Sequence, residues 1–198
     1  MTVETPTRFS PLSDRRDDFA QLPAGLTVRE LPFLTQLTLR TEPGGPAAAS
    51  VEACLGITLP GPVRAESSGD VEALWMGPDE WLLVAPEGGR HDLLTRLRSA
   101  IGDEDFATVT DVSAQRTTLD LSGHLVRTVL TQGCAIDLDP RATPAGSCPT
   151  TLLGQAPVTL VVREDGASAV RLLVRASFAS YVADWLLDAC TEYRGGTG

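Results

Sequence analysis

Apolar and polar residues alternate along the chain with a period that changes several times, as it does where short strands and helices follow one another. In residues 35–40, Leu37 and Leu39 fall on one side of an extended chain, which predicts a strand. Pro46 stands where a helix can begin and Gly56 where it can end. By the same reasoning we expect strands at 63–66, 71–75 and 80–85, and a helix at 92–101.

The same order of elements begins again near residue 116. We expect a strand at 116–121, a helix after Ser122-Gly123, strands at 150–153, 158–162 and 170–174, and a last helix capped by Ser177. Leu82-Leu83-Val84 corresponds to Leu172-Leu173-Val174, which predicts an internal repeat with an offset of 90 residues. The predicted fold class is α+β, with two tandem split-βαβ (ferredoxin-like) halves and antiparallel sheets.

This pattern divides the chain into an extended N-terminal arm at 1–32, a first α+β half at 33–113 and a second at 114–194, the two halves forming one compact unit. Four prolines exclude a long helix from the arm. Its apolar residues leave two alternatives open, a disordered tail or a segment that docks on another chain. We take Phe9, Leu12 and Phe19 as candidate subunit-interface residues.

A long connection between a helix and a strand, residues 133–154, is the most informative segment. Connections of this length are usually functional, yet this one contains no His, Lys or Glu. Asp137 and Asp139 could hold a cation, but two carboxylates fall short of the six or more oxygens of a hard-cation site, so local pairing with Arg141 is the better interpretation. The segment therefore points to recognition or assembly, and Asp137, Asp139 and Arg141 complete the candidate interface.

Charge and composition remove several function classes. The net charge of −10 argues against nucleic acid and anionic membrane surfaces as partners. All 16 basic residues are Arg, so a P-loop lysine, a Schiff-base lysine and a Lys general base are excluded. The longest apolar run, residues 81–86, is too short to cross a bilayer, and no signal peptide is recognisable, so we expect a cytoplasmic protein.

Individual candidates for chemistry are weak. Asp79 and Glu80 are adjacent carboxylates, but neighbouring residues of a strand point to opposite faces, so they do not form a catalytic pair. Cys134 and Cys148 would need two more ligands to hold zinc, and small buried side chains are the simpler interpretation, although distant residues could converge. His124 lacks the GxSxG of a serine hydrolase, and His91 reads as a loop residue. We predict no catalytic, cofactor-binding or metal-binding residues in this chain.

Several motifs, taken together and in order over most of the chain, resemble one family. They are Leu31-Pro32-Phe33-Leu34-Thr35-Gln36-Leu37-Thr38-Leu39-Arg40, Trp75-Met76-Gly77-Pro78-Asp79-Glu80-Trp81-Leu82-Leu83, Asp111-Val112-Ser113 followed by Arg116-Thr117, Gly133-Cys134-Ala135-Ile136-Asp137-Leu138-Asp139-Pro140-Arg141, and Arg175-Ala176-Ser177-Phe178-Ala179-Ser180-Tyr181. The chain resembles the gamma subunit of heterotetrameric sarcosine oxidase.

The resemblance implies a fold similar to the folate-binding module of the glycine-cleavage T-protein. It implies an accessory role in an enzyme that oxidatively demethylates sarcosine to glycine, with formation of hydrogen peroxide and methylene-tetrahydrofolate. The implied partners are alpha, beta and delta subunits. FAD, FMN, NAD, zinc and tetrahydrofolate are implied for the whole complex, none of them bound by this chain. The alternatives are a stand-alone folate-binding or one-carbon transfer protein and a stand-alone structural or regulatory protein.

Overall fold

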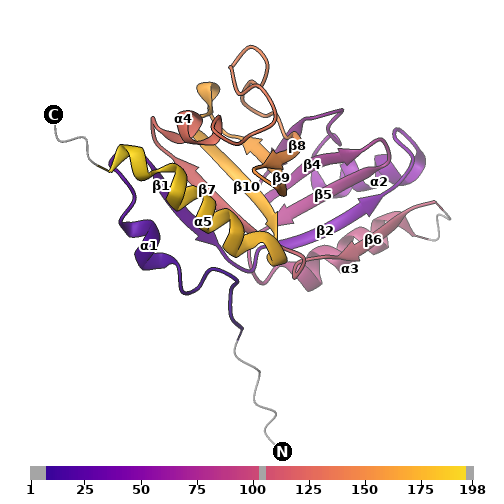
Figure 1. Ribbon diagram of the computed structural model, residues 1–198. Coiled ribbons are helices and arrows are strands. Elements are labelled where there is room, and N and C mark those ends of the chain that lie inside the picture. The colour runs from indigo at the N-terminus through magenta and orange to yellow at the C-terminus, as the bar shows by residue number, and fades with distance from the viewer. Residues whose placement is uncertain (1–7, 103–105, 195–198) are drawn as a thin grey trace, which may run out of the picture.

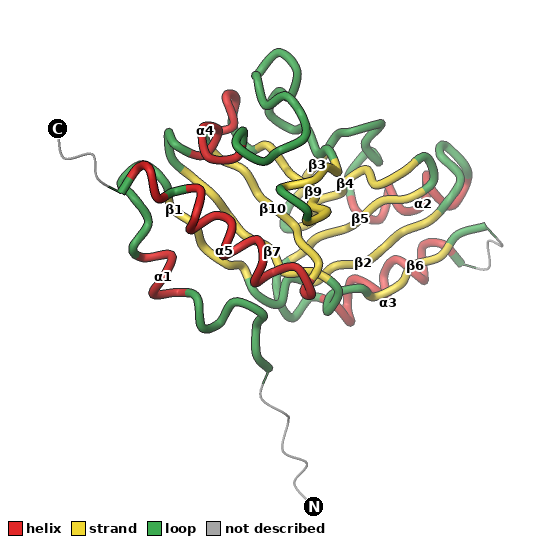
Figure 2. Tube along the Cα trace, viewed as in Figure 1, coloured by secondary structure: helices red, strands yellow, loops and turns green. Residues whose placement is uncertain are grey.

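The computed structural model describes residues 8–102 and 106–194 and contains two sheets with helices against them (Figures 1 and 2). The first sheet has the order β3-β4-β5-β2-β6 and the second β1-β7-β10-β9-β8 in this described part, and every neighbouring pair is antiparallel. The elements are β1 (Thr27–Leu31), β2 (Thr35–Arg40), β3 (Ala65–Ser68), β4 (Val71–Gly77), β5 (Glu80–Ala85), β6 (Thr108–Asp111), β7 (Arg116–Ser122), β8 (Thr150–Leu153), β9 (Ala156–Val162), β10 (Ala169–Arg175), α1 (Arg16–Ala20), α2 (Pro46–Leu55), α3 (Arg90–Ile101), α4 (Val126–Leu130), α5 (Ala179–Ala189) and the 3₁₀ turns η1 (Asp165–Ala167), η2 (Ala176–Phe178) and η3 (Thr191–Tyr193). The α+β fold class with antiparallel sheets is confirmed.

Helices form the outer layers of the molecule. Figure 1 shows α5 in front of the second sheet and α2 and α3 behind the first. One hydrophobic cluster lies between α2, α3 and the first sheet, and a second lies between α1, α4, α5 and the other sheet. A smaller cluster of Leu74, Leu82, Val84, Cys148, Val161 and Leu173 joins the two sheets. The halves therefore meet through their sheets.

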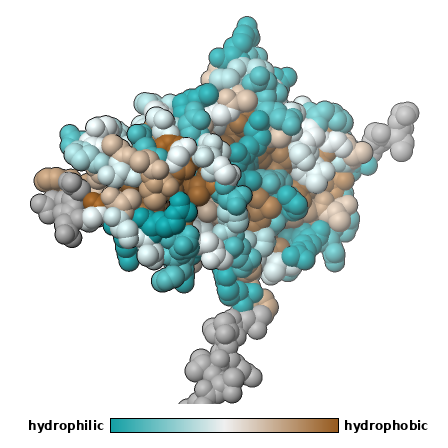
Figure 3. Space-filling model, turned by 180° about the vertical axis from the view of Figure 1, so that it is seen from behind, coloured by the Kyte–Doolittle hydropathy of each residue, from teal (hydrophilic) through white to brown (hydrophobic). Residues whose placement is uncertain are grey.

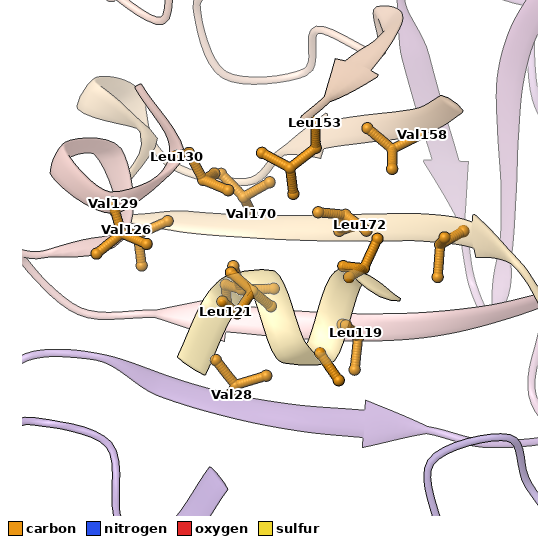
Figure 4. Close-up of a cluster of buried hydrophobic side chains, with 14 of the residues drawn as sticks. Val28, Leu119, Leu121, Val126, Val129, Leu130, Leu153, Val158, Val170 and Leu172 are labelled. Carbon is orange, nitrogen blue, oxygen red and sulfur yellow. The ribbon is translucent and has the colours of Figure 1, made fainter. Parts of the chain in front are cut away.

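The second sheet supplies the larger core. Figure 4 shows its apolar side chains converging on α5 from different elements, among them Val28 of β1, Leu121 of β7 and Leu172 of β10. The last helix buries one face against this sheet, where Val182, Ala183 and Leu186 are buried. Burying a leucine or valine side chain stabilises the fold by about 1.5–3 kcal/mol. This cluster therefore stabilises the second half strongly.

The strand order repeats in the two sheets, but Leu82 and Leu172 are not equivalent positions, as an offset of 90 residues would require. Leu83 lies opposite Leu37 and Leu172 lies opposite Leu119, and all four face helices. Leu82 faces the other sheet instead, so its equivalent in the second half is not Leu172. Successive residues of a strand point to opposite faces, so a shift of one residue exchanges the helix side for the sheet side.

Of the extended arm predicted over 1–32, residues 1–7 lie outside the described residues, and residues 27–31 belong to a sheet. These residues form β1, which pairs with β7 and occupies the same edge of its sheet as β6 does in the other. Ser10 and Thr117 both donate hydrogen bonds to the Glu30 carboxylate, the latter at 2.5 Å, and fasten the preceding segment to β7. Prolines argue against a helix, but a short strand between two of them satisfies the same constraint.

Two local predictions have opposite outcomes. Gly56 ends α2 in the left-handed conformation, with a φ of 65°, as its place in the sequence predicted. Ser177 does not cap the last helix. It lies within the 3₁₀ turn η2, and α5 begins after Phe178 with no side-chain cap hydrogen bond.

Candidate functional site

The connection over residues 133–154 leaves and rejoins the fold at one point. The Gly154 N–H donates to the Gly133 carbonyl at 2.9 Å, and the aromatic rings of Trp185 and Tyr181 on α5 cover these two glycines. A Cβ on Gly133 would lie 2.5 Å from a ring carbon of Trp185. Glycine is therefore required here because of the close approach of α5.

The outer part of this connection carries the three charged candidates together. The Asp139 N–H donates to Asp137 at 2.8 Å, and the Arg141 Nε donates to Asp139 at 2.8 Å. The hydrogen bonds from Arg141 lower the pKa of Asp139. The side chain of Arg141 is 91% exposed. The structure thus brings the three residues into one exposed, locally paired turn.

The last part of the connection binds the first half of the chain. The Ala65 N–H donates to the Gly146 carbonyl at 2.9 Å, and the Cys148 N–H donates to the Val63 carbonyl at 2.8 Å. The Cys148 thiol is buried and donates to the Arg64 carbonyl at 2.8 Å, and burial raises its pKa to about 11. Residues 146–148 therefore contribute to the contact between the halves.

The remaining titratable candidates lie apart from one another. Both histidines are exposed, with His124 against Gly25. Asp79 accepts two hydrogen bonds from Arg40 at 3.1 Å. In residues 8–102 and 106–194, no three His, Cys, Asp or Glu side chains gather in a way that could hold a metal ion. The zinc alternative at Cys134 and Cys148 therefore gains no support from the structure.

The three apolar interface candidates of the N-terminal segment separate into two groups. Leu12 is 0% exposed and Phe19 is buried, and both belong to the core beneath α5. Both are core residues, because their side chains pack inside this chain. Phe9 is 78% exposed and remains a candidate for contact with another molecule.

A cleft of about 730 Å³ opens where the two halves meet near the start of β2. Phe9 and Phe33 line it together with the arginines Arg8, Arg90 and Arg116. Arg8 lies 4.1 Å from the centre of the Phe33 ring and pairs with Glu87 at 3.1 Å. Arg90 pairs with Asp111 at 3.1 Å. The cleft combines aromatic walls with positive charge, in a chain whose net charge is −10.

A charge network centred on a buried carboxylate lies between the sheets. The Glu72 carboxylate of β4 accepts hydrogen bonds from Arg163, which follows β9, and from Arg171 of β10. Arg171 also donates to Asp120 at 2.9 Å. The sequence pattern predicts neither this network nor the cleft. One signal in the sequence could have revealed the network. A charged residue stands inside each of two apolar strands, at 72 and 171, and charged side chains are rarely buried unless they are paired.

The surface opposite to the view of Figure 1 is mixed in character. Figure 3 shows hydrophobic patches separated by hydrophilic residues over this face. No helix in the described part of the chain has the length and apolar character needed to cross a membrane.

The chain matches the model of the "Sarcosine oxidase, gamma subunit family" over residues 40–192. It is 41% identical to the sarcosine oxidase subunit gamma of Corynebacterium sp. (strain U-96), over 85% of this chain and 80% of that protein. It is 37% identical to the subunit gamma of Arthrobacter sp., over 98% and 95% of the two chains.

Solved structures agree with these matches. A chain of the heterotetrameric sarcosine oxidase from Corynebacterium sp. U-96, in complex with pyrrole 2-carboxylate, aligns with a TM-score of 0.86 and 36% identity over 96% of this chain and 98% of that one. The glycine cleavage system aminomethyltransferase T from Bartonella henselae aligns with a TM-score of 0.65 and 13% identity, over 90% of this chain and 49% of that one, which shows the T-protein-like fold. On these matches to its sequence and its fold, the chain belongs to the sarcosine oxidase gamma subunit family.

Proposed function

We propose that this chain is the accessory gamma subunit of a heterotetrameric sarcosine oxidase, an enzyme that oxidatively demethylates sarcosine to glycine. The observation that supports the proposal is the match, over 96% of this chain and at a TM-score of 0.86, to a chain of such a heterotetramer. Its partners are alpha, beta and delta subunits, and the complex works in the cytoplasm. Hydrogen peroxide and methylene-tetrahydrofolate are the other products of the complex.

The cofactors of the complex belong to the other subunits in this proposal. FAD, FMN and NAD are held by the alpha and beta subunits and zinc by the delta subunit. Two features of this chain support the assignment. Its sequence has no GxGxxG after a strand, and its described residues offer no cluster of zinc ligands. This chain contributes contacts, and no catalytic side chain, to the reaction.

Two exposed surfaces are the proposed contacts with other subunits. The first is the turn formed by Asp137, Asp139 and Arg141, where the Arg141 side chain projects into solvent. The second is Phe9 at the mouth of the cleft. Aromatic and arginine side chains are enriched at protein interfaces, which favours both surfaces.

Co-expression with the candidate alpha, beta and delta subunits tests the proposal. We expect one stable complex that oxidises sarcosine, and a chain that remains alone in size-exclusion chromatography contradicts the assembly role. Charge reversal by Arg141→Glu should weaken assembly more than it lowers the melting temperature of the lone chain. The control Arg98→Glu changes an exposed arginine of α3 and should leave assembly unchanged. Equal losses of assembly and melting temperature would remove this turn from the interface.

The stand-alone alternative is tested on the isolated chain. Tetrahydrofolate is titrated into it by calorimetry. Saturable binding would favour a folate-binding protein with the T-protein-like fold, and we expect none.

A further inference from the structure

Two arginines lie directly opposite each other at one end of the second sheet. Arg116 of β7 and Arg175 of β10 are partners in the antiparallel register, so their side chains leave the same face of the sheet. The same two strands place Asp120 opposite Arg171, and this pair is joined at 2.9 Å. Opposite charges across strands stabilise a sheet, whereas like charges directly opposite destabilise it. The Arg116–Arg175 pair therefore repels across the strands, whereas the neighbouring Asp120–Arg171 pair attracts.

Neither arginine has a carboxylate of its own within the described residues. Arg175 is exposed and makes no ion pair within 4.0 Å in residues 8–102 and 106–194. The Arg116 Nη1 is shielded from solvent and has no hydrogen-bond partner among the same residues. Burial and the charge of Arg175 lower the pKa of Arg116, and Glu80 opposes this shift. A desolvated guanidinium without an anion is costly.

Arg116 lies in the cleft between the halves, and Arg175 adjoins it. Arg116 lines the cleft, and so does Ala176, the residue that follows Arg175. The other cleft arginines already have partners, Arg90 with Asp111 and Arg8 with Glu87. The uncompensated positive charge in and beside the cleft is therefore that of Arg116, which lines it, and of Arg175, which precedes a lining residue.

We propose that the Arg116–Arg175 pair binds a carboxylate group of a partner subunit that enters the cleft. This inference rests on the proposed function as a subunit. A guanidinium fork matches a carboxylate in a bidentate manner, and the ligand would provide the missing partner of Arg116. The 78% exposed Phe9 beside the cleft favours a protein ligand, because exposed aromatic side chains are enriched at interfaces.

The test compares assembly and folding in the same variants. Arg116→Gln, Arg175→Gln and the double variant are co-expressed with the candidate large subunits, beside the control Arg98→Gln. We expect the double variant to lose at least about tenfold in apparent affinity, since removing one side of a charge pair leaves the partner's carboxylate unpaired in the complex. Its melting temperature as an isolated chain should stay equal or rise, because like-charge repulsion is removed. The control should assemble like the unmodified chain.

The outcomes separate this proposal from the proposed function. If the unmodified chain assembles and the double variant assembles equally well, the carboxylate proposal is overturned while the subunit role stands. If the unmodified chain does not assemble, the subunit role fails and this proposal fails with it. Succinate and inorganic phosphate are also titrated into the isolated chain. Tight binding of either that depends on Arg116 and Arg175 would make the cleft a small-anion site and overturn the partner assignment.

Discussion

The Arg163 guanidinium donates to both carboxylate oxygens of Glu72, at 2.5 and 2.7 Å, across the contact between the two sheets. The Glu72 side chain is 8% exposed, and Arg171 approaches its second oxygen at 3.3 Å. One carboxylate of the first half thus holds two arginines of the second. Asp120 accepts a hydrogen bond from Arg171 at 2.9 Å, so two carboxylates balance the two arginines at the contact between the halves.

Glu72→Gln should destabilise the chain by about 2–4 kcal/mol, because it leaves two partly buried arginines without their shared carboxylate. Urea unfolding followed by circular dichroism measures the loss. The matched control is Glu66→Gln, an exposed carboxylate on the neighbouring strand β3, which should change stability by less than about 0.5 kcal/mol. Equal effects of the two variants would mean that the network adds nothing to the contact.

Gly133→Ala should destabilise the chain by about 1–3 kcal/mol, because the new methyl group would overlap the Trp185 ring. Gly61→Ala is the control, since nothing lies within 4 Å of a Cβ at that position. Thermal unfolding of both variants checks the difference. If Gly133→Ala were as stable as Gly61→Ala, α5 could not lie as close to this segment as it does here.

Cys148 should make stability fall at alkaline pH. Its pKa rises from 9.0 to about 11 in the folded chain, so the folded state keeps the proton that the unfolded state releases. The stabilisation is fully present below pH 9 and is lost as the pH rises through 11. Between pH 8 and pH 10.5, the unmodified chain should therefore lose about 1–2 kcal/mol more of its free energy of unfolding than Cys148→Ala does.

The alkaline range suits this measurement, because the chain has no lysine to titrate there. The control is Cys54→Ala, a half-buried cysteine outside the contact between the halves. Parallel losses in Cys148→Ala and the unmodified chain would show that another group is responsible.

The N-terminal segment offers a paired comparison. Leu12→Ala should destabilise the chain by about 2–5 kcal/mol, because a fully buried leucine leaves a cavity. Phe9→Ala should leave the melting temperature nearly unchanged and weaken assembly with the other subunits. Chemical denaturation measures the stability of each variant, and size-exclusion chromatography measures its assembly with the other subunits. A destabilised Phe9→Ala variant that assembles normally would contradict the proposed contact.

The pattern of apolar residues correctly predicted most strands, because each of them buries at least one face. It missed β6, in which only Val109 is buried, and β1, which lies between two prolines. The repeat was visible in Leu82-Leu83-Val84 and Leu172-Leu173-Val174, but runs that are apolar on both faces do not reveal which leucine faces a helix. The face that each leucine occupies depends on the pairing register, which is known only from the neighbouring strands.

The candidate interface residues also divide into those that the sequence predicted correctly and those that required the structure. Local spacing correctly indicated that Asp139 pairs with Arg141, because the two are neighbours in a turn. It could not distinguish Leu12 and Phe19, which pack into this chain's own core, from Phe9, which is exposed. The hydrophobic effect does not depend on which surface covers an apolar side chain. The sequence alone therefore does not tell whether such a side chain packs in its own core or against a partner.

The sequence by itself determined the α+β class, the two related halves and, through its ordered motifs, the family, because these depend on local periodicity and on residue order. Only the tertiary structure decided the buried Glu72 network, the exposure of Phe9 and the juxtaposition of Arg116 with Arg175. Each of these joins residues that are distant along the chain, and their distances are set by sheet register and by the packing of the halves. Charge compensation is a property of the folded chain, and for that reason the uncompensated arginines became visible only there.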